Sequence, residues 1–407
     1  MDKLQHRKAA RRLVIKDAQG NVVTNRSVHA KLINHKFIFA CGAFFTAPML
    51  DPTAPEELRE HFRGYWESWK ELFNLGVLPF YQGRYEPVQG QTQEESTLRA
   101  AKFLQENGRK VKGHPLCWHT VDARWLMDMS NEEVLENQKF RIRREMTAFK
   151  DIITVWDVIN EVVIMPVFDK TENAITRLCQ HMGRIPLIKA LFEQARAVDP
   201  NATLLINDFN TSEKYRQMIQ ELIEAGCTPD VIGIQSHQHQ GFWGMEKLIE
   251  VVDRFASFGL PLHFTENTFV SGHEMPPEIV DLNDYQIPEW PTTPEGEDRQ
   301  ARNMLEMVDY LFAHPSVHAF TCWDYNDGQW LGAPSGLVRK DGSRKPSYEA
   351  LWQRINRDWS TDVTLQTNDK GEIELEGFMG LYSIECCDSS ANVQLERGDD
   401  VITVTLG

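Results

Sequence analysis

Short apolar, β-prone runs recur between residues 37 and 324, and helix-like stretches separate them at intervals of roughly 25 to 50 residues. Eight such runs can be recognised: FIFACGAF (37–44), LGVLPFYQ (75–82), KVKGHPLCW (110–118), TVWDVINE (154–161), TLLINDFN (203–210), VIGIQSHQH (231–239), LPLHFTEN (260–267) and VHAFTCWD (317–324). Near-continuous apolar strands that alternate with helices indicate a parallel sheet covered by helices. Eight repeats of this unit predict an α/β fold, a closed (β/α)8 TIM barrel over residues 37–357.

The stretches between the runs carry helix boundary signals. Pro55 followed by Glu56 is typical of a helix start, because proline suits the first turn and an acid suits the positive end of the helix dipole. Ser130 and Glu133 form a capping box, and Gly226 marks a helix end. These signals support the alternation of strands and helices that a barrel requires.

Residues 1–36 and 358–407 lie outside the predicted barrel. Around the turn signal at Gly20, the alternation in RLVIKDAQGNVV predicts a β-hairpin over residues 11–34. The C-terminal region shows five short alternating segments, DVTLQT, EIELEG, YSIECC, NVQLER and VITVTL. Neither region has much core of its own. We therefore expect the N-terminal hairpin and the C-terminal strands to pack together as one small accessory β-sandwich beside the barrel.

The apolar runs turn polar or aromatic in their second halves. The residues concerned are His114, Trp118, Asn160, Glu161, Asn207, Asp208, Gln235, His237, Glu266, Trp323 and Asp324. In a (β/α)8 barrel the C-terminal strand ends surround the active site, so these distant segments are predicted to converge on one pocket. The long connection at residues 267–294, which is rich in proline and acids, is expected to form a wall of that pocket.

Composition narrows the class of ligand. Hydrophobic residues make up 42% and charged residues 25% of the 407 residues, which is typical of soluble globular proteins. The net charge of −16 argues against nucleic acid, which needs concentrated Lys and Arg, and favours a neutral ligand. No apolar run approaches the ~18 residues that span a bilayer, so no membrane partner is expected. Nothing in the pattern specifies an oligomeric state.

The first residues, MDKLQHRKAARR, contain no hydrophobic segment after their positive charges, which predicts that the chain as given is not exported. The expected location is cytoplasmic, and it becomes secreted or periplasmic if a signal peptide has been removed. Seven cysteines without CxxC spacing favour free thiols in a reducing compartment.

Two glutamates, Glu161 and Glu266, each end an apolar run. Cleaving a glycosidic bond with retention needs two carboxyl groups about 5–5.5 Å apart, one to protonate the leaving oxygen and one to attack the anomeric carbon. The ends of the fourth and seventh runs face each other across a pocket only wide enough for side chains. The pair therefore suits this chemistry, and solvated loop glutamates are the plainer alternative. Neither step needs redox chemistry or a metal, so no cofactor is expected.

The order of the motifs resembles glycoside hydrolase family 10, the family of retaining endo-β-1,4-xylanases. The motifs are GHPLCWH (113–119), WDVINE (156–161), NDFN (207–210), GIQSHQH (233–239) and FTEN (264–267). The resemblance spans most of residues 37–356. It implies a barrel in which Glu161 is the acid/base and Glu266 the nucleophile, acting on a β-1,4-linked plant polysaccharide or oligosaccharide of the xylan type. The residues that it places around the sugar at the site of cleavage are His114, Trp118, Asn160, Gln235, His237 and Trp323.

The chain departs from the family pattern after the second run. Members typically carry a Glu-Asn and a Lys-Trp pair before a Glu-Pro, whereas in LPFYQGRYEP (78–87) only Glu86 and Pro87 match. The residues that replace the polar groups gripping the sugar on its non-reducing side are Phe80, Tyr81, Gln82 and Arg84, of which Tyr81, Gln82 and Arg84 are candidate substrate contacts. Thr268 stands where an Asp usually orients the active-site histidine, so proton handling around His237 is expected to differ.

Physical roles follow for the polar and aromatic groups. Glu161 has to be protonated for the first step, which a facing carboxylate promotes because like charges raise one pKa. Glu266 has to stay ionised, which hydrogen bonds from His237 or Asn160 would favour. Asn160 could instead donate to the sugar 2-hydroxyl. The side chains expected to offer flat apolar faces to sugar rings are Trp118, Trp323 and Trp330, and packing in the core is the alternative for each.

Two other classes of function stay open. A metal-dependent hydrolase would use histidines at strand ends. The candidates are His237 and His239, supplemented by His114, His119 and His263. Against it, the first run has no HxH and the two glutamates would lack a role. A non-catalytic carbohydrate-binding barrel is suggested by the altered residues 78–87. Within the enzymes, an exo-acting β-glycosidase on oligosaccharides or plant glycosides is the alternative to an endo-xylanase.

Overall fold

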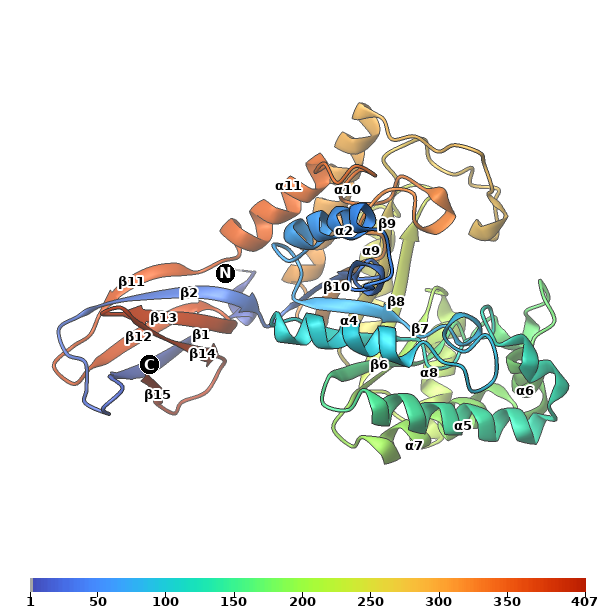
Figure 1. The fold of residues 1–407 in the computed structure, drawn as a ribbon, viewed down its shortest axis with the longest axis horizontal. Helices are drawn as coiled ribbons and strands as arrows, with labels where there is room; N and C mark the ends of the chain where they lie inside the picture. The colour runs from blue at the N-terminus through green and yellow to red at the C-terminus, as the bar shows by residue number, and fades with distance from the viewer. Residues whose placement is uncertain (1–2) are drawn as a thin grey trace.

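The computed structural model describes residues 3–407 of the chain. It contains an eight-stranded barrel and, to one side of it, a β module built from both ends of the chain (Figure 1). Within residues 3–407, no helix combines the length and the apolar character that a membrane crossing requires.

Eight parallel strands close the barrel in the order β10-β3-β4-β5-β6-β7-β8-β9. They are β3 (Ile38–Gly42), β4 (Leu75–Pro79), β5 (Lys110–His114), β6 (Ile153–Asn160), β7 (Thr203–Asp208), β8 (Val231–Gln238), β9 (Leu262–Phe269) and β10 (Val317–Cys322). Each predicted apolar run overlaps one of them, so the predicted TIM barrel is confirmed. Every residue of β9 is buried, as expected for a strand with the barrel interior on one side and helices on the other.

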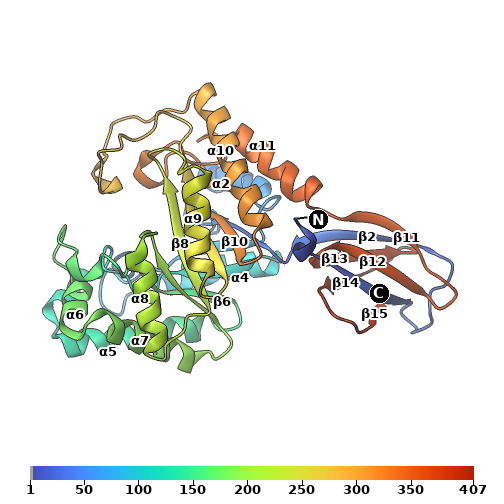
Figure 2. The same ribbon diagram turned by 180° about the vertical axis from the view of Figure 1, so that it is seen from behind.

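Helices surround the barrel (Figure 2). They are α1 (Thr46–Met49), α2 (Glu56–Trp69), α3 (Gln82–Tyr85), α4 (Glu94–Glu106), α5 (Asn131–Ala148), α6 (Ala174–Met182), α7 (Arg184–Val198), α8 (Glu213–Glu224), α9 (Met245–Ala256), α10 (Pro294–Ala313) and α11 (Pro346–Gln353). In α9 one stripe at helical spacing is buried, formed by Leu248, Val251, Val252 and Phe255. The predicted capping box is present at the start of α5, and α2 begins directly after Pro55.

The β module consists of two sheets, one in the order β12-β1-β15 and the other in the order β11-β2-β13-β14. The strands are β1 (Lys8–Lys16), β2 (Ser27–His35), β11 (Asp362–Gln366), β12 (Glu372–Phe378), β13 (Gly380–Cys386), β14 (Ser389–Leu395) and β15 (Ile402–Thr405). Both chain ends therefore contribute strands to the accessory module, as the sequence predicted.

The predicted hairpin over residues 11–34 is wrong in one respect. β1 pairs with β12 and β15, whereas β2 pairs with β11 and β13, so the two N-terminal strands lie in different sheets. Leu13 of β1 and Val28 of β2 are both fully buried. Placing the strands in separate sheets lets these apolar faces pack against each other, which two neighbouring strands of one sheet cannot do.

Arg7, just before β1, attaches the module to the barrel. Its guanidinium donates to the carbonyl oxygens of Phe312 (2.8 Å), His314 (2.8 Å) and Val317 (2.5 Å). The same group lies over the rings of Phe37 and Phe312, at 4.7 and 5.3 Å from their centroids. These contacts belong to the N-terminal end of the barrel, so the module sits at the end opposite the predicted active face.

Candidate active site

Glu161 follows β6 directly and Glu266 lies within β9, and both adopt a backbone conformation that glutamate rarely takes. Their φ angles are +57° and +58°, in the left-handed region. Each such residue costs on the order of 1–3 kcal/mol and persists only where the surroundings hold it. This backbone conformation directs both carboxyl groups from the strand ends into the same space. Nothing in the sequence pattern predicts the left-handed conformation.

A network of side-chain amides joins the two glutamates. Asn207 Nδ2 donates to Glu266 Oε1 (2.7 Å) and to Asn160 Oδ1 (2.9 Å). Gln235 Nε2 donates to Asn160 Oδ1 (3.1 Å) and to Glu161 Oε1 (3.3 Å). Asn160 Nδ2 also reaches Glu161 Oε1, at 3.3 Å. All three amides are buried, so the network fixes the relative positions of the carboxyl groups.

Glu266 is surrounded by donors and positive charge. His237 Nε2 lies 3.2 Å from Glu266 Oε2, and His114 Nε2 lies 3.8 Å from Oε1. Behind His114, Asp157 lies 2.6 Å from Nδ1 and 2.8 Å from Lys112 Nζ. Burial alone would raise the pKa of Glu266, but the charges of His114 and His237 and the hydrogen bond from His237 outweigh it, so the pKa is lowered. Glu266 is therefore held as a carboxylate.

Glu161 is in the opposite electrostatic situation. Burial of its carboxyl group, and secondly the negative charge of Glu266, raise the pKa of Glu161 to about 8. Two hydrogen bonds oppose this shift, from Trp118 Nε1 to Glu161 Oε2 at 2.8 Å and from Gln235 Nε2 to Glu161 Oε1 at 3.3 Å. At neutral pH the site therefore holds one protonated and one ionised carboxyl group.

Four aromatic residues line the space around the carboxyl groups. The Trp323 ring lies edge-on to His114, with centroids 5.1 Å apart, and the Trp330 ring lies 4.4 Å from that of His237. Tyr81 lies 5.5 Å from Trp118 and 5.8 Å from His114. Trp323 is buried, while Trp118, Trp330 and Tyr81 stay partly exposed, so their faces are open to a ligand.

The segment after β4 contributes fewer contacts than the sequence suggested. Tyr81 enters the site, and Arg84 is an exposed side chain 5.7 Å from the Tyr81 ring centroid. Gln82 is buried in the other direction, where it donates to Asn137 and accepts from Gln138 on α5. The prediction that Gln82 lines the pocket is therefore not supported by its position.

Phe80, the remaining residue of that segment, also points into the core. Its ring is fully buried and packs edge-on against Trp156 and Phe149. Of the replaced positions, Tyr81 is the one in direct contact with the site, where its ring lies beside Trp118 and His114. The reason is local: β4 ends at Pro79, and both Phe80 and Gln82 turn toward α5, where Phe80 contacts Phe149 and Gln82 binds Asn137 and Gln138.

Thr268 lies beside His237, as predicted, and beside His239, which the sequence did not predict. Its hydroxyl Oγ1 is 3.3 Å from His237 Nδ1 and 3.1 Å from His239 Nδ1, and it accepts from the Gln238 backbone N–H at 3.2 Å. A threonine brings no negative charge to His237, unlike the acid that the family usually places there.

Several contacts around the two glutamates were not predicted from the sequence. Asp157 and Lys112 lie behind His114, inside the apolar halves of β6 and β5. A single charged residue within an otherwise apolar strand is the feature of the sequence that could have indicated them. Asp208 is one of the polar residues that the sequence places at strand ends. In the structure it accepts a hydrogen bond from the Val163 N–H at 2.9 Å and so holds the chain just after Glu161. Burial raises the pKa of Asp208 to about 7.

The histidines proposed for a metal site do not gather. His263 is the second residue of β9, three residues before Glu266 and toward the N-terminal end of the strand. His119 is buried against Phe168, with ring centroids 4.4 Å apart. In the part of the chain that the structure describes, no group of three or more His, Cys, Asp or Glu side chains is arranged to share a metal ion.

The connection after β9, which the sequence predicted as a wall, runs along the face that holds the glutamates. Within residues 270–293, the Met275 N–H donates to His239 O (2.8 Å) at the end of β8, and Asn283 Oδ1 accepts from Trp330 Nε1 (3.3 Å). The segment has a small apolar core of its own, formed by Val270, Met275, Trp290 and Ala333. This core gives a long connection a defined shape.

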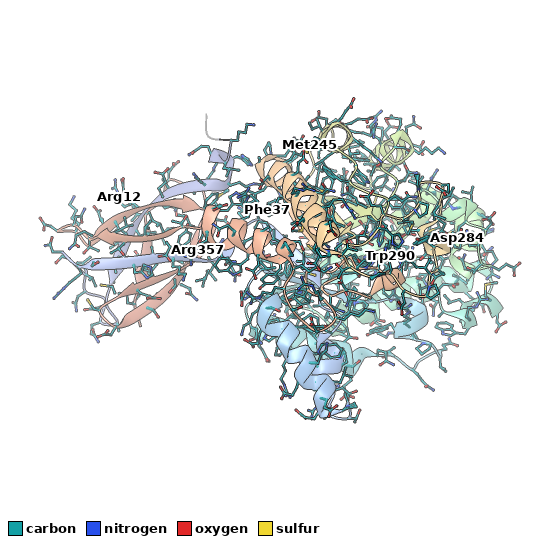
Figure 3. The ribbon with its side chains drawn as sticks, turned by 90° about the horizontal axis from the view of Figure 1, so that it is seen from above. Arg12, Phe37, Met245, Asp284, Trp290 and Arg357 are labelled. Atoms are coloured by element: carbon teal, nitrogen blue, oxygen red, sulfur yellow. The ribbon has the colours of Figure 1, made fainter. Side chains whose placement is uncertain are left out.

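An ion pair joins the two loops that leave the glutamate strands. Lys170 Nζ, in the connection after β6, lies 2.6 Å from Asp284 Oδ2 and 3.7 Å from Asp281 Oδ2. Figure 3 shows Asp284 and Trp290 on the side of the barrel remote from the β module. Because β7 and β8 lie between β6 and β9, the joined loops span the C-terminal ends of those two strands.

Comparisons with known proteins show the family of this chain. Residues 82–354 match the pattern described as Glycosyl hydrolase family 10. Endo-1,4-beta-xylanase A of Caldicellulosiruptor saccharolyticus is 27% identical over 315 residues, which are 72% of this chain and 84% of that protein. Endo-1,4-beta-xylanase B of Paenibacillus barcinonensis is 31% identical over 293 residues, or 65% and 83% of the two chains.

A solved structure supports the fold. Xylanase 10B from Thermotoga petrophila, in complex with xylobiose, superposes with a TM-score of 0.61 at 21% identity, over 78% of this chain and 94% of that chain. The family pattern covers more than half of the 407 residues, and its span includes both glutamates. The chain therefore belongs to glycosyl hydrolase family 10.

Proposed function

We propose that this protein is a retaining β-glycoside hydrolase that cleaves β-1,4-linked plant polysaccharide or oligosaccharide of the xylan type. The observation that carries the proposal is the pair of left-handed glutamates at the strand ends, Glu161 and Glu266, which buried amides join in one hydrogen-bonded network. The pKa values of the two carboxyl groups are displaced in opposite directions, with that of Glu161 raised to about 8 and that of Glu266 lowered. A pair of carboxyl groups whose surroundings separate their pKa values in this way supplies an acid and a nucleophile at the same pH.

The proposed reaction has two steps. First, Glu161 gives its proton to the leaving oxygen while Glu266 attacks the anomeric carbon, so the glycosidic bond breaks and an ester to Glu266 forms. The ester carries no charge, so the pKa of Glu161 falls and its carboxylate can take a proton from water. That water then attacks the anomeric carbon and releases Glu266. The Asn160 amide, beside Glu161, is placed to donate to the sugar 2-hydroxyl.

The substrate class rests on relatives and on the aromatic walls. Two relatives are named endo-1,4-beta-xylanases, and one solved relative holds xylobiose. Partly exposed rings of Trp118, Trp330 and Tyr81 offer the flat apolar faces that sugar rings pack against. These features support a xylan-type substrate.

The ion pair between Lys170 and Asp284 favours an exo-acting β-glycosidase as the second candidate. It joins the loops above β7 and β8 and so limits the room for a polymer that continues past the glutamates. Product sizes decide between the two actions. An endo-acting enzyme releases a ladder of oligosaccharides from xylan, whereas an exo-acting enzyme releases one short product and favours oligosaccharides and aryl β-glycosides. Binding of these ligands without any product after long incubation would instead indicate a non-catalytic barrel.

We expect the first product to keep the anomeric configuration of the substrate. Attack by Glu266 inverts the anomeric carbon and attack by water inverts it again, so the β-anomer is released. Proton NMR of the anomeric region during the first minutes of turnover distinguishes this product from the α-anomer. An α-anomer formed first would contradict the double displacement.

We expect kcat/KM to fall as pH rises through about 8. The first step needs Glu161 protonated, and above its pKa of about 8 the acid is lost, at about tenfold in rate for each further pH unit. On the acid side, the lowered pKa of Glu266 keeps the nucleophile ionised, so kcat/KM should hold steady down to mildly acidic pH. The measurement is kcat/KM for an aryl β-xyloside across pH.

Trp118→Phe tests whether Glu161 sets the alkaline limb of the pH profile of kcat/KM. The indole N–H stabilises the ionised form of Glu161, and phenylalanine removes this donor while keeping a ring. The limb should therefore move to higher pH in the variant, whatever happens to KM. A limb that stays in place, or that falls already near pH 5, would contradict the assignment of Glu161 as the acid.

A further inference from the structure

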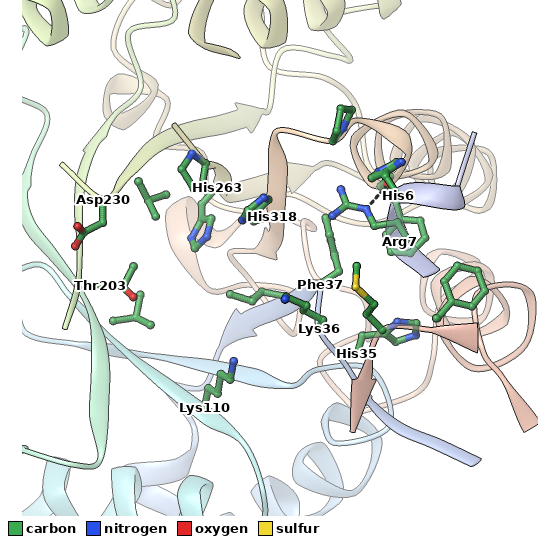
Figure 4. A pocket seen from close by; sticks show the side chains of 18 of the residues that line it. His6, Arg7, His35, Lys36, Phe37, Lys110, Thr203, Asp230, His263 and His318 are labelled. Carbon is green, nitrogen blue, oxygen red and sulfur yellow. Dashed lines mark hydrogen bonds between the residues drawn. The ribbon is translucent and has the colours of Figure 1, made fainter. Parts of the chain in front are cut away.

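A second cavity lies at the N-terminal end of the barrel, where the barrel meets the β module. Its volume is about 630 Å³. Figure 4 shows its lining, which comes from the N-terminal ends of barrel strands, the start of the chain and the end of α10. It is separate from the glutamate pair, because its lining includes neither Glu161 nor Glu266 and none of the amides that join them.

The lining carries more positive than negative charge. Its cations are Arg7, Lys36 and Lys110, and Asp230 is the one acid among the described lining residues. The Asp230 carboxylate is already bound, because Oδ2 lies 2.5 Å from Arg196 Nη2 and accepts from the Leu204 N–H at 2.8 Å. The cavity therefore has no free acid to balance its cations, in a chain whose net charge is −16.

The partners of the three cations leave charge uncompensated. Arg7 is held by backbone carbonyl oxygens and, among residues 3–407, has no carboxylate within 4 Å. Lys110 is exposed and likewise forms no ion pair with any described residue. Lys36 lies 3.2 Å from Glu396, in a pair whose two side chains are half exposed and which therefore contributes little.

The pKa values of histidines in the lining respond to nearby positive charge. The pKa of His318 is lowered by burial and then by the charges of Arg7 and Lys36. Burial, followed by the charges of Lys112 and His318, lowers the pKa of His263 to about 3. His6 Nε2, also in the lining, is buried without a hydrogen-bond partner. A polar group buried in this way lacks the acceptor or donor that a ligand could provide.

We propose that this cavity binds a compact anion with more than one negative charge, such as a phosphate group or a di- or tricarboxylate. Lys36, Lys110 and His318 face the same space (Figure 4) and would donate charge-assisted hydrogen bonds to its oxygens. A volume of about 630 Å³ suits a small molecule and excludes a folded partner.

The test is isothermal titration of the full chain with inorganic phosphate and, separately, with citrate, at constant ionic strength. The variant is Lys36→Gln together with Lys110→Gln, two surface changes that leave the core intact. The matched control is Lys214→Gln together with Lys370→Gln, which removes the same charge from exposed positions outside the cavity. We expect at least one of the two anions to bind the parent and the control alike, with Kd raised at least tenfold in the Lys36/Lys110 variant.

Comparing the two anions shows which kind of charged group the cavity binds. Binding of phosphate alone assigns the cavity to a phosphoryl group, and binding of citrate alone assigns it to carboxylates. Equal Kd values in the parent and the Lys36/Lys110 variant would overturn the proposal, as would binding of neither anion. Thermal unfolding in phosphate against chloride at the same ionic strength gives a second readout. Equal stabilisation of all three proteins by phosphate would reveal a general salt effect and no site.

Discussion

Replacing Glu266 with Ala is expected to lower kcat by at least ~10³-fold, with the fold retained, because the change removes the group that bonds to the sugar. The Glu266 side chain is surrounded by hydrogen-bond donors and is not part of the apolar core. The thermal unfolding midpoint and the circular dichroism spectrum of the variant should therefore stay near those of the parent. Initial rates on an aryl β-xyloside and on xylan measure the loss. Glu376→Ala, an exposed change on β12, is the matched control and should keep full activity.

Azide sharpens the test of Glu266. In the alanine variant a small anion can enter the space left by the carboxyl group and attack the anomeric carbon from that same side. A single attack inverts the carbon, so an α-glycosyl azide should form from a β-glycoside with a good leaving group. Activity near the parent level, or a β-glycosyl azide, would assign the nucleophile to another residue.

Replacing Glu161 with Ala is expected to cost at least ~10³-fold on natural substrates, because the leaving sugar oxygen then departs without a proton. The loss should depend on the leaving group. With a dinitrophenyl β-glycoside, whose phenolate leaves unaided, the first step should survive and the ester to Glu266 should accumulate. A burst of phenolate followed by slow turnover would show this, and mass spectrometry would detect the added sugar.

The same variant distinguishes the two glutamates. Azide that replaces the missing base attacks the ester from the Glu161 side, so it should restore turnover and yield a β-glycosyl azide, the opposite anomer from the Glu266 variant. An equal loss on dinitrophenyl and natural glycosides would contradict the acid role of Glu161, since the protonation requirement differs between these substrates.

Much of the fold could be predicted because it depends on periodicity. Eight apolar runs, nearly all of which turn polar or aromatic in their second halves, sufficed to place eight strands and the end of the barrel that carries the polar groups. The hairpin at residues 11–34 was wrong because local alternation identifies a strand but not its neighbour, and the neighbours of β1 and β2 come from the last fifty residues of the chain. Pairing between distant segments leaves no trace in the local pattern.

The site was predictable where residue type implied the chemistry. Glu161, Glu266 and the buried amides came from positions at strand ends, and the structure brings them into one network. Side-chain direction was the weak point. Gln82 and Tyr81 are adjacent, yet one packs under α5 and the other enters the site, and only the backbone decides which. The left-handed backbone at both glutamates is likewise a property of the folded chain.

The pairing of β1 with β15 has a consequence for the order of events during synthesis. β1 leaves the ribosome before the other strands described here, but the register that joins Leu13 to Ile402 cannot form until residue 402 has been made. Until then β1 exposes two unpaired edges and an apolar face, while the barrel assembles in between. Late closure of so long a loop is slow and prone to wrong pairing, so this module is where a truncated or hurried chain should begin to aggregate.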